Sequence, residues 1–243
     1  MLFRSPPQVD PLSPEVYAPI GLSGLVIGFN VERYVKSGNA DEAALSGTRV
    51  ARLNLTPRLV AKLLSQSYRS QVSIGGSPPV DYGWVTSNPQ SMASDPDFLQ
   101  FNPEFELLLS GDDRTFGGLQ LPAGGSDAAV QLWRWILADS EAAAWLDGAA
   151  DEWGMRVNPV YSTSGDVNPN GFGFAKPVPN NYPKADAYCF QAPARGVGES
   201  IIPPPLCSTD WMPYSRNYGE TARAARTGFD GARIVENPVA VSS

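Results

Sequence analysis

Hydrophobic positions recur with a helical period in the segment that follows Thr56. The apolar side chains on one face of this segment are Leu59, Val60, Leu63, Leu64 and Tyr68. Thr56 is a good N-cap and Pro57 is favoured at the first helical position, so we expect a helix that begins at Pro57. Arg58 and Lys62 lie off the apolar face.

A second helical period follows the small-residue turn Leu121–Asp127. The predicted helix runs over Ser126–Leu137, and a further helix is expected from Asp139 or Ser140 up to the helix-ending Gly148.

Continuous apolar runs outside these helical segments are typical of buried strands. Val16–Val31 contains such a run, and Glu104–Ser110 ends in a row of leucines. Shorter helices are expected over Ser94–Leu99 and Tyr218–Arg226. The alternation of strand and helix predicts an α/β layered fold, whose ligands bind near helix starts.

Composition divides the chain into three parts. Residues 1–156 carry the periodic pattern and form the expected α/β binding domain. Residues 157–214 hold many prolines and little periodicity, and residues 215–243 form a helix and a tail.

Charge and residue usage exclude several classes of function. The net charge of −7 argues against nucleic acid and against anionic membrane surfaces. The chain has no histidine, which removes Ser-His-Asp and Cys-His catalysis and most zinc sites, so we expect neither an enzyme nor a metal or cofactor. The longest apolar run is far shorter than the ~20 residues that a membrane span needs.

Cys189 and Cys207 are the two cysteines, and they lie in the Pro-rich part. We expect a disulfide between them, which would indicate an oxidising, extracellular or cell-surface location. Two unpaired thiols are the alternative. Met1–Pro7 has no apolar core of a signal peptide, so we expect this chain to be a fragment of an exported protein.

The turn before the long helix has the composition of an anion site. The first amides of a helix have no partner within it, and glycine lets a ligand approach the backbone. Gly124, Gly125, Ser126 and Asp127 are therefore the candidate ligand-binding residues. The alternative is that Ser126 or Asp127 only caps the helix.

Acidic and aromatic residues elsewhere carry weaker signals. Asp95, Asp97, Asp112 and Asp113 are expected to be solvated turn residues, because no twelve-residue calcium loop is present.

Trp133 and Trp135 point to different faces of the predicted helix, so at least one should be in the core. Trp84, Trp153 and Trp211 lie in loop-like stretches and are better candidates for exposed contacts.

Four segments in order resemble the phosphate-binding PstS-type periplasmic-binding proteins (type II), in the form found within large secreted actinobacterial proteins. Ala18–Asn30 resembles P-V-x-x-G-G-x-x-x-x-x-N, and Leu53–Leu64 resembles L-x-L-T-G-x-x-L-A-x-I-Y. Asp95–Pro103 is similar to N-D-P-x-I-x-x-L-N-P, and Gly124–Asp127 falls where the family has its R-x-D-G-S-G-T phosphate loop.

The chain also departs from that family. Leu121 and Pro122 stand where the family has a phosphate-pairing arginine, and Asp127 puts a carboxylate where it has a hydroxyl. The N-terminal half of the family pattern is missing, and Ser5 is the remaining candidate from it.

The resemblance implies an extracytoplasmic solute-binding protein that takes phosphate or a related oxyanion and delivers it to an ABC transporter. The alternative is a cell-surface interaction or adhesion domain that binds other surface proteins and has kept the fold without the small-ligand site. A secreted hydrolase has the least support, since no nucleophile motif is present.

Overall fold

The computed structural model describes residues 24–35, 40–71, 83–108, 121–122, 125–167, 178–182, 195–197, 200–202, 214–215 and 217–228. The α-helices are α1 (Ala40–Ala43), α2 (Pro57–Leu64), α3 (Gly83–Thr86), α4 (Pro96–Leu99), α5 (Asp127–Ala138), α6 (Ser140–Leu146) and α7 (Tyr218–Thr227). Short 3₁₀ turns are η1 (Arg69–Gln71), η2 (Met92–Ser94), η3 (Pro103–Glu106) and η4 (Pro159–Tyr161). The strands are β1 (Leu121–Pro122), β2 (Arg195–Val197), β3 (Ser200–Ile202) and β4 (Tyr214–Ser215).

The predicted helices form, and side-chain caps explain where they begin. The Thr56 side chain accepts a hydrogen bond from the Leu59 amide and Pro57 occupies the first position of α2. Ser126 caps α5 through the Ala129 amide, and Asp139 caps α6 through the Ala142 amide. Each cap satisfies an amide that has no acceptor inside its helix.

Glycine residues explain where two of the helices end. Gly148, just after α6, has a φ of +109°, and Gly228 ends α7 with a φ of +65°. Glycine adopts these left-handed angles without a steric penalty, which confirms the predicted end of α6.

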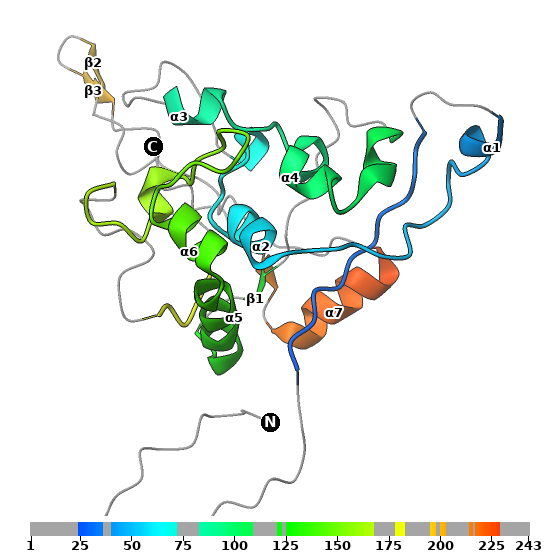
Figure 1. Ribbon diagram of the computed structural model, residues 1–243. Helices are drawn as coiled ribbons and strands as arrows, with labels where there is room; N and C mark the ends of the chain where they lie inside the picture. The colour runs from blue at the N-terminus through cyan, green and yellow to red at the C-terminus, as the bar shows by residue number, and fades with distance from the viewer. Residues whose placement is uncertain are drawn as a thin grey trace, which may run out of the picture.

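The core lies where α2, α5 and α6 pack against one another (Figure 1). Trp133, Trp145, Phe98, Leu59 and Ile136 are almost completely buried there. Trp133 is 1% exposed and Trp135 is 45% exposed, so the two indoles of α5 face opposite environments, as the sequence indicates.

Among the described residues, pairing between strands is limited to two short sheets. β1 runs parallel to β4, with Leu121 beside Tyr214, and β2 pairs with β3 in an antiparallel hairpin. α7 packs on β1 and β4, which brings the C-terminal helix to the start of α5 (Figure 1). A layered α/β sheet therefore stays a prediction.

Two predicted strands are wrong in their described parts. Leu25–Phe29 was expected to be buried on both faces, yet no strand forms over these residues and Val26 is 84% exposed. Glu104 and its neighbours fold into η3, because Pro103 after Asn102 starts a tight turn, and Leu108 makes a single bridge to Val35. The rest of both predicted strands lies outside the described residues.

Candidate functional site

The predicted anion site lies at the N-terminus of α5, where a distant segment covers it. The Ser126 amide donates to the Asn180 carbonyl oxygen at 2.7 Å. The Asn180 side chain also lies over Gly125, where an added Cβ would come within 2.8 Å of its Nδ2 atom. Glycine at position 125 therefore makes room for Asn180, which is a protein group rather than an external ligand.

Three hydroxyl groups meet beside this helix start. Ser126 Oγ lies 3.2 Å from the Tyr218 hydroxyl, which lies 3.4 Å from the Tyr182 hydroxyl. Tyr182 is only 4% exposed, and burial, followed by its hydrogen bond with Tyr218, raises the pKa of Tyr182. We call Ser126, Tyr182 and Tyr218 the hydroxyl cluster; its members are neutral donors at physiological pH.

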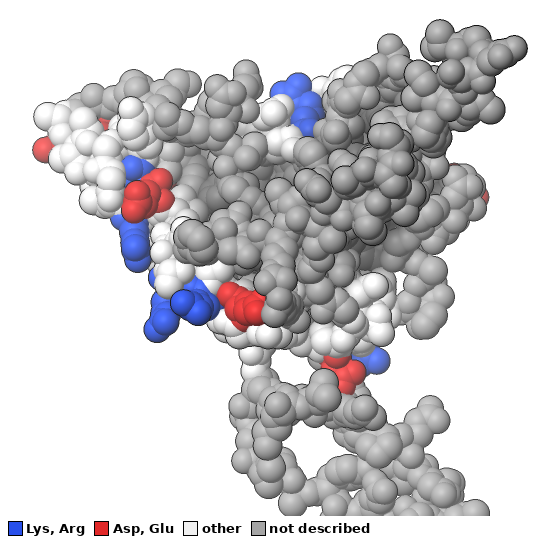
Figure 2. All heavy atoms as spheres, turned by 180° about the vertical axis from the view of Figure 1, so that it is seen from behind, with Lys and Arg blue, Asp and Glu red and all other residues white. Residues whose placement is uncertain are grey.

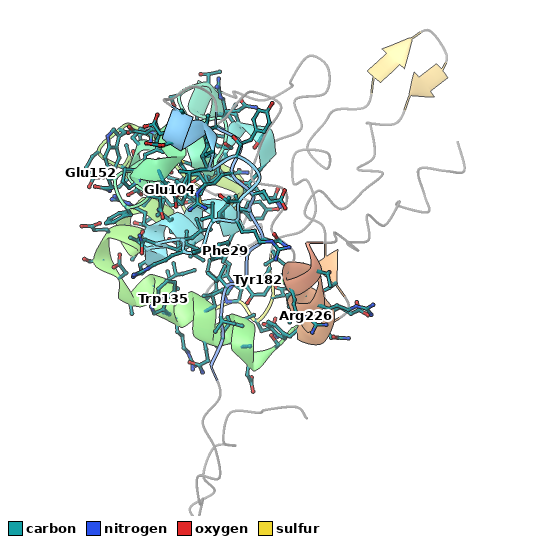
Figure 3. The ribbon with its side chains drawn as sticks, turned by 90° about the vertical axis from the view of Figure 1, so that its right-hand side faces the viewer. Phe29, Glu104, Trp135, Glu152, Tyr182 and Arg226 are labelled. Atoms are coloured by element: carbon teal, nitrogen blue, oxygen red, sulfur yellow. The ribbon has the colours of Figure 1, made fainter. Side chains whose placement is uncertain are left out.

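The segment that carries Tyr182 is attached to α5 at several points. Trp133 Nε1 donates to the Asn181 carbonyl at 3.0 Å, and the Trp133 and Tyr182 rings lie 6.3 Å apart. The start of α5 is therefore bounded by residues from three separate parts of the chain. Figure 3 shows Tyr182 beside α7 and the start of α5.

The sequence-predicted ligand residues are only partly within the described chain. Gly125, Ser126 and Asp127 are described, and Asp127 is half-buried in the first turn of α5. Ser5, Gly124, Cys189 and Cys207 lie outside the described residues, and so do their predicted roles.

A second cluster, which the sequence analysis missed, lies beneath α2. Lys62 is fully buried, and its Nζ atom lies 2.9 Å from Asp95, 2.9 Å from Asp97 and 2.7 Å from Asp151. Asp95 Oδ2 also accepts a hydrogen bond from the buried Tyr68 hydroxyl at 2.8 Å. One ammonium group thus compensates three carboxylates that come from two segments, the start of α4 and the turn at Asp151.

Arg58 extends this cluster to the surface. Its Nε atom donates to Asp97 Oδ2 at 2.8 Å and its Nη2 atom donates to Asp97 Oδ1 at 3.0 Å, so the two side chains form a bidentate pair. Arg58 also bonds the exposed Glu152, at 3.0 Å, and lies 3.4 Å from Glu141. We call Arg58, Lys62, Tyr68, Asp95, Asp97 and Asp151 the buried charge network.

Burial and pairing change the pKa values in this network in opposite ways. Burial raises the pKa of Asp95, and the charge of Lys62 offsets this only in part. For Asp97, burial acts upward but the Arg58 hydrogen bond and the Lys62 charge outweigh it, so its pKa is lowered. Burial acts to lower the pKa of Lys62, but the charges of Asp95 and Asp97 outweigh it and raise the pKa.

The expectation that Asp95 and Asp97 are solvated turn residues is therefore wrong, and Arg58 and Lys62, which lie off the apolar face of α2, are buried as well. Lys62, Asp95 and Asp97 are 0% exposed and Arg58 is 7% exposed. They are buried because each charge has a partner of opposite sign, which an apolar-face analysis ignores. Cations four residues apart on α2, together with Asp95-Pro96-Asp97, were the signal that could have predicted the network.

The charged groups of the network are paired with one another. Among the described residues, no cluster of acidic residues or cysteines is arranged to hold a metal ion, and the Lys62 ammonium lies between the three carboxylates. No buried side-chain nitrogen or oxygen in the described part of the chain lacks a partner. Acidic and basic side chains are interspersed on the visible described surface (Figure 2).

Comparison with known proteins leaves the family open. No family profile, curated protein or solved structure matches this chain. None of the helices in the described ranges is long and apolar enough to cross a membrane.

Proposed function

We propose that this protein is a non-catalytic, extracytoplasmic solute-binding protein that takes phosphate or a related oxyanion at the start of α5. The observation that carries the proposal is the meeting of the Ser126, Tyr182 and Tyr218 hydroxyls at a helix N-terminus. The helix dipole is positive there, and neutral hydroxyl donors suit an anion. The resemblance to PstS-type proteins supports the same position in the chain.

Binding requires an exchange of partners at this site. An oxyanion would take the Ser126 amide from the Asn180 carbonyl, and the Ser126 and Tyr218 hydroxyls would turn toward the ligand. No hydrogen bond among the described residues uses the Ala128 amide, which is in the first turn of α5 and is a further donor. Asp127 opposes the ligand through like charge, unless it accepts a proton from it.

In this proposal the ligand would be delivered to an ABC transporter from an extracellular or cell-surface location. The PstS resemblance supports delivery to a transporter, and the expected Cys189–Cys207 disulfide supports the location.

A specific observation favours a second function, a cell-surface interaction domain without a small-ligand site. Asn180 already supplies the acceptor and the bulk that an anion would supply at Gly125 and Ser126. If that contact is permanent, Ser126 is a helix cap only.

Calorimetric titration of the 243-residue chain with inorganic phosphate separates the two functions. We expect Asp127→Thr to strengthen phosphate binding, because it removes a like charge, and Tyr218→Phe to weaken it several-fold. Ser126→Ala should weaken binding, whereas Thr56→Ala, which removes the matched cap of α2, should not. If Asp127→Thr binds neither phosphate nor sulfate, the oxyanion proposal is wrong and the interaction domain is the better account.

A further inference from the structure

A polar cleft of about 470 Å³ lies between η1, the Thr86–Ser94 segment and the turn that carries Trp153. It is separate from the start of α5: the neighbouring Glu152 and the hydroxyl-cluster Tyr182 lie well apart in Figure 3. Its volume is in the range of sites that hold small ligands, about 300–1,000 Å³. Neither the oxyanion site nor the buried charge network uses this cleft.

The charge of the cleft is unusual for an acidic protein. Among the described residues that line it, Arg69 is the one with a formal charge. The Arg69 side chain is exposed and forms no ion pair with any described residue. A guanidinium without a carboxylate partner at the wall of a cleft is well placed to bind an anionic group in a bidentate way.

The wall with Arg69 is built by backbone bonds. The Arg69 amide donates to the Pro89 carbonyl at 3.1 Å, and the Ser70 amide donates to the Gln90 carbonyl at 3.0 Å. Asn88 lies beneath, with its side chain donating to the Ser67 and Arg156 carbonyls. Gln90 and Ser87 add polar side chains to the lining, so the wall is fixed and rich in hydrogen-bonding groups.

The lining of the cleft also includes a half-exposed tryptophan on a tight turn. The Trp153 amide and the Met155 amide both donate to Asp151 Oδ1, at 3.0 and 2.8 Å. Gly154 has a φ of +87°, which lets the chain turn between them. Trp153 is 44% exposed, so a large apolar ring faces solvent at the edge of a polar cleft.

We propose that this cleft binds an acidic sugar, a saccharide unit that carries a carboxylate, with Trp153 stacking on the sugar ring and Arg69 pairing with its carboxylate. Indole faces contact the apolar face of a sugar ring, and the hydroxyl groups of a saccharide match the amide and hydroxyl groups of the lining. The guanidinium of Arg69, the one charged group among the described residues of the lining, selects the charged sugar over a neutral one.

The test is a calorimetric titration of the full 243-residue chain with tetragalacturonate, maltotetraose and inorganic phosphate. We expect tetragalacturonate to bind and maltotetraose to bind at least tenfold more weakly. Arg69→Ala and Trp153→Ala should each weaken tetragalacturonate binding at least tenfold. Added salt should weaken binding to the parent chain more than binding to Arg69→Ala.

Arg134→Ala and Trp135→Ala are matched controls, because both residues are exposed on α5 and Trp135 is 45% exposed, close to the 44% of Trp153. Both controls should bind tetragalacturonate as the parent does. Equal binding of maltotetraose, loss of binding in the controls, or no binding of tetragalacturonate each overturns the proposal. If phosphate binding is lost in Arg69→Ala, the cleft is a phosphate site and the acidic-sugar proposal is wrong. Phosphate binding that is lost in Ser126→Ala instead belongs to the site at the start of α5 and concerns the proposed function alone.

Discussion

The buried charge network and the hydroxyl cluster both join distant segments of the chain, but they do so with different chemistry. Lys62 contacts its carboxylates at 2.7 to 2.9 Å with no exposure to solvent. The hydroxyls of Ser126, Tyr218 and Tyr182 are neutral, only partly buried as a group, and 3.2 to 3.4 Å apart. The first arrangement cannot lose Lys62 without leaving buried carboxylates uncompensated, whereas the second can exchange partners with water or a ligand.

The largest effect is expected from Lys62→Met, which leaves the buried Asp95 and Asp151 without the cation that they contact. Asp97 loses one of its two cations and keeps its pair with Arg58. Breaking a buried ion pair in this way costs about 3–5 kcal/mol. Urea denaturation should show a large loss of unfolding free energy, while Arg134→Met on the exposed face of α5 should change it by less than about 0.5 kcal/mol. A loss of less than about 1 kcal/mol for Lys62→Met would mean that the network contributes little.

A comparison of Asp97→Asn with Asp95→Asn sharpens the account of the network. The lowered pKa of Asp97 means that its charge stabilises the fold, and the raised pKa of Asp95 means that its charge does not. Asn at position 95 keeps one oxygen that can still accept from the Asp97 amide and cap α4, and its amide nitrogen can donate to the Tyr68 hydroxyl oxygen. Asp97→Asn should therefore destabilise the protein by on the order of 2 kcal/mol more than Asp95→Asn in urea denaturation. Equal losses would contradict the pKa directions.

Stability should fall at alkaline pH. The pKa of Lys62 is raised above 10.5 and that of Tyr68 above 10.0 in the folded protein. A group with a raised folded pKa contributes its full stability below its unfolded pKa, and this stability is lost as the pH rises through the folded value. Melting temperatures should therefore fall above about pH 10.

The fall should be less steep in Tyr68→Phe than in the matched Tyr34→Phe, because Tyr34 is 55% exposed. Identical pH profiles for the two variants would show that Tyr68 does not contribute to this dependence.

The smallest effect belongs to the hydroxyl cluster. Tyr218→Phe removes one neutral hydroxyl that water can replace, so it should cost less than about 1 kcal/mol in the same denaturation assay. A loss as large as that of Lys62→Met would remove the distinction between the two regions.

The sequence predicts helices well where local signals agree with the core. Thr56, Ser126 and Asp139 were expected as caps, and each accepts the amide hydrogen bond that a cap should. Strands were predicted less well, because the apolar run at Leu25–Phe29 gives no information on a pairing partner.

The candidate sites divide in the same way. Ser126 at the helix start could be predicted from local composition. Its contacts could not, because Asn180 lies 54 residues and Tyr218 lies 92 residues further along the chain. The buried charge network is still less local, since Lys62 and Asp151 are separated by 89 residues. Hydrophobic periodicity reports local secondary structure and gives no information on which distant charged residues pair in the folded protein.

The reach of Lys62 also has a consequence for the lifetime of the folded protein. Its bonds to Asp95 and Asp151 close chain separations of 33 and 89 residues, and each charge must lose its water before the partner is in place. We expect such contacts to form late in folding, so they should affect mainly the rate of unfolding rather than the rate of folding. The Lys62 ammonium group would then contribute to kinetic stability, because it would slow the unfolding of the assembled core.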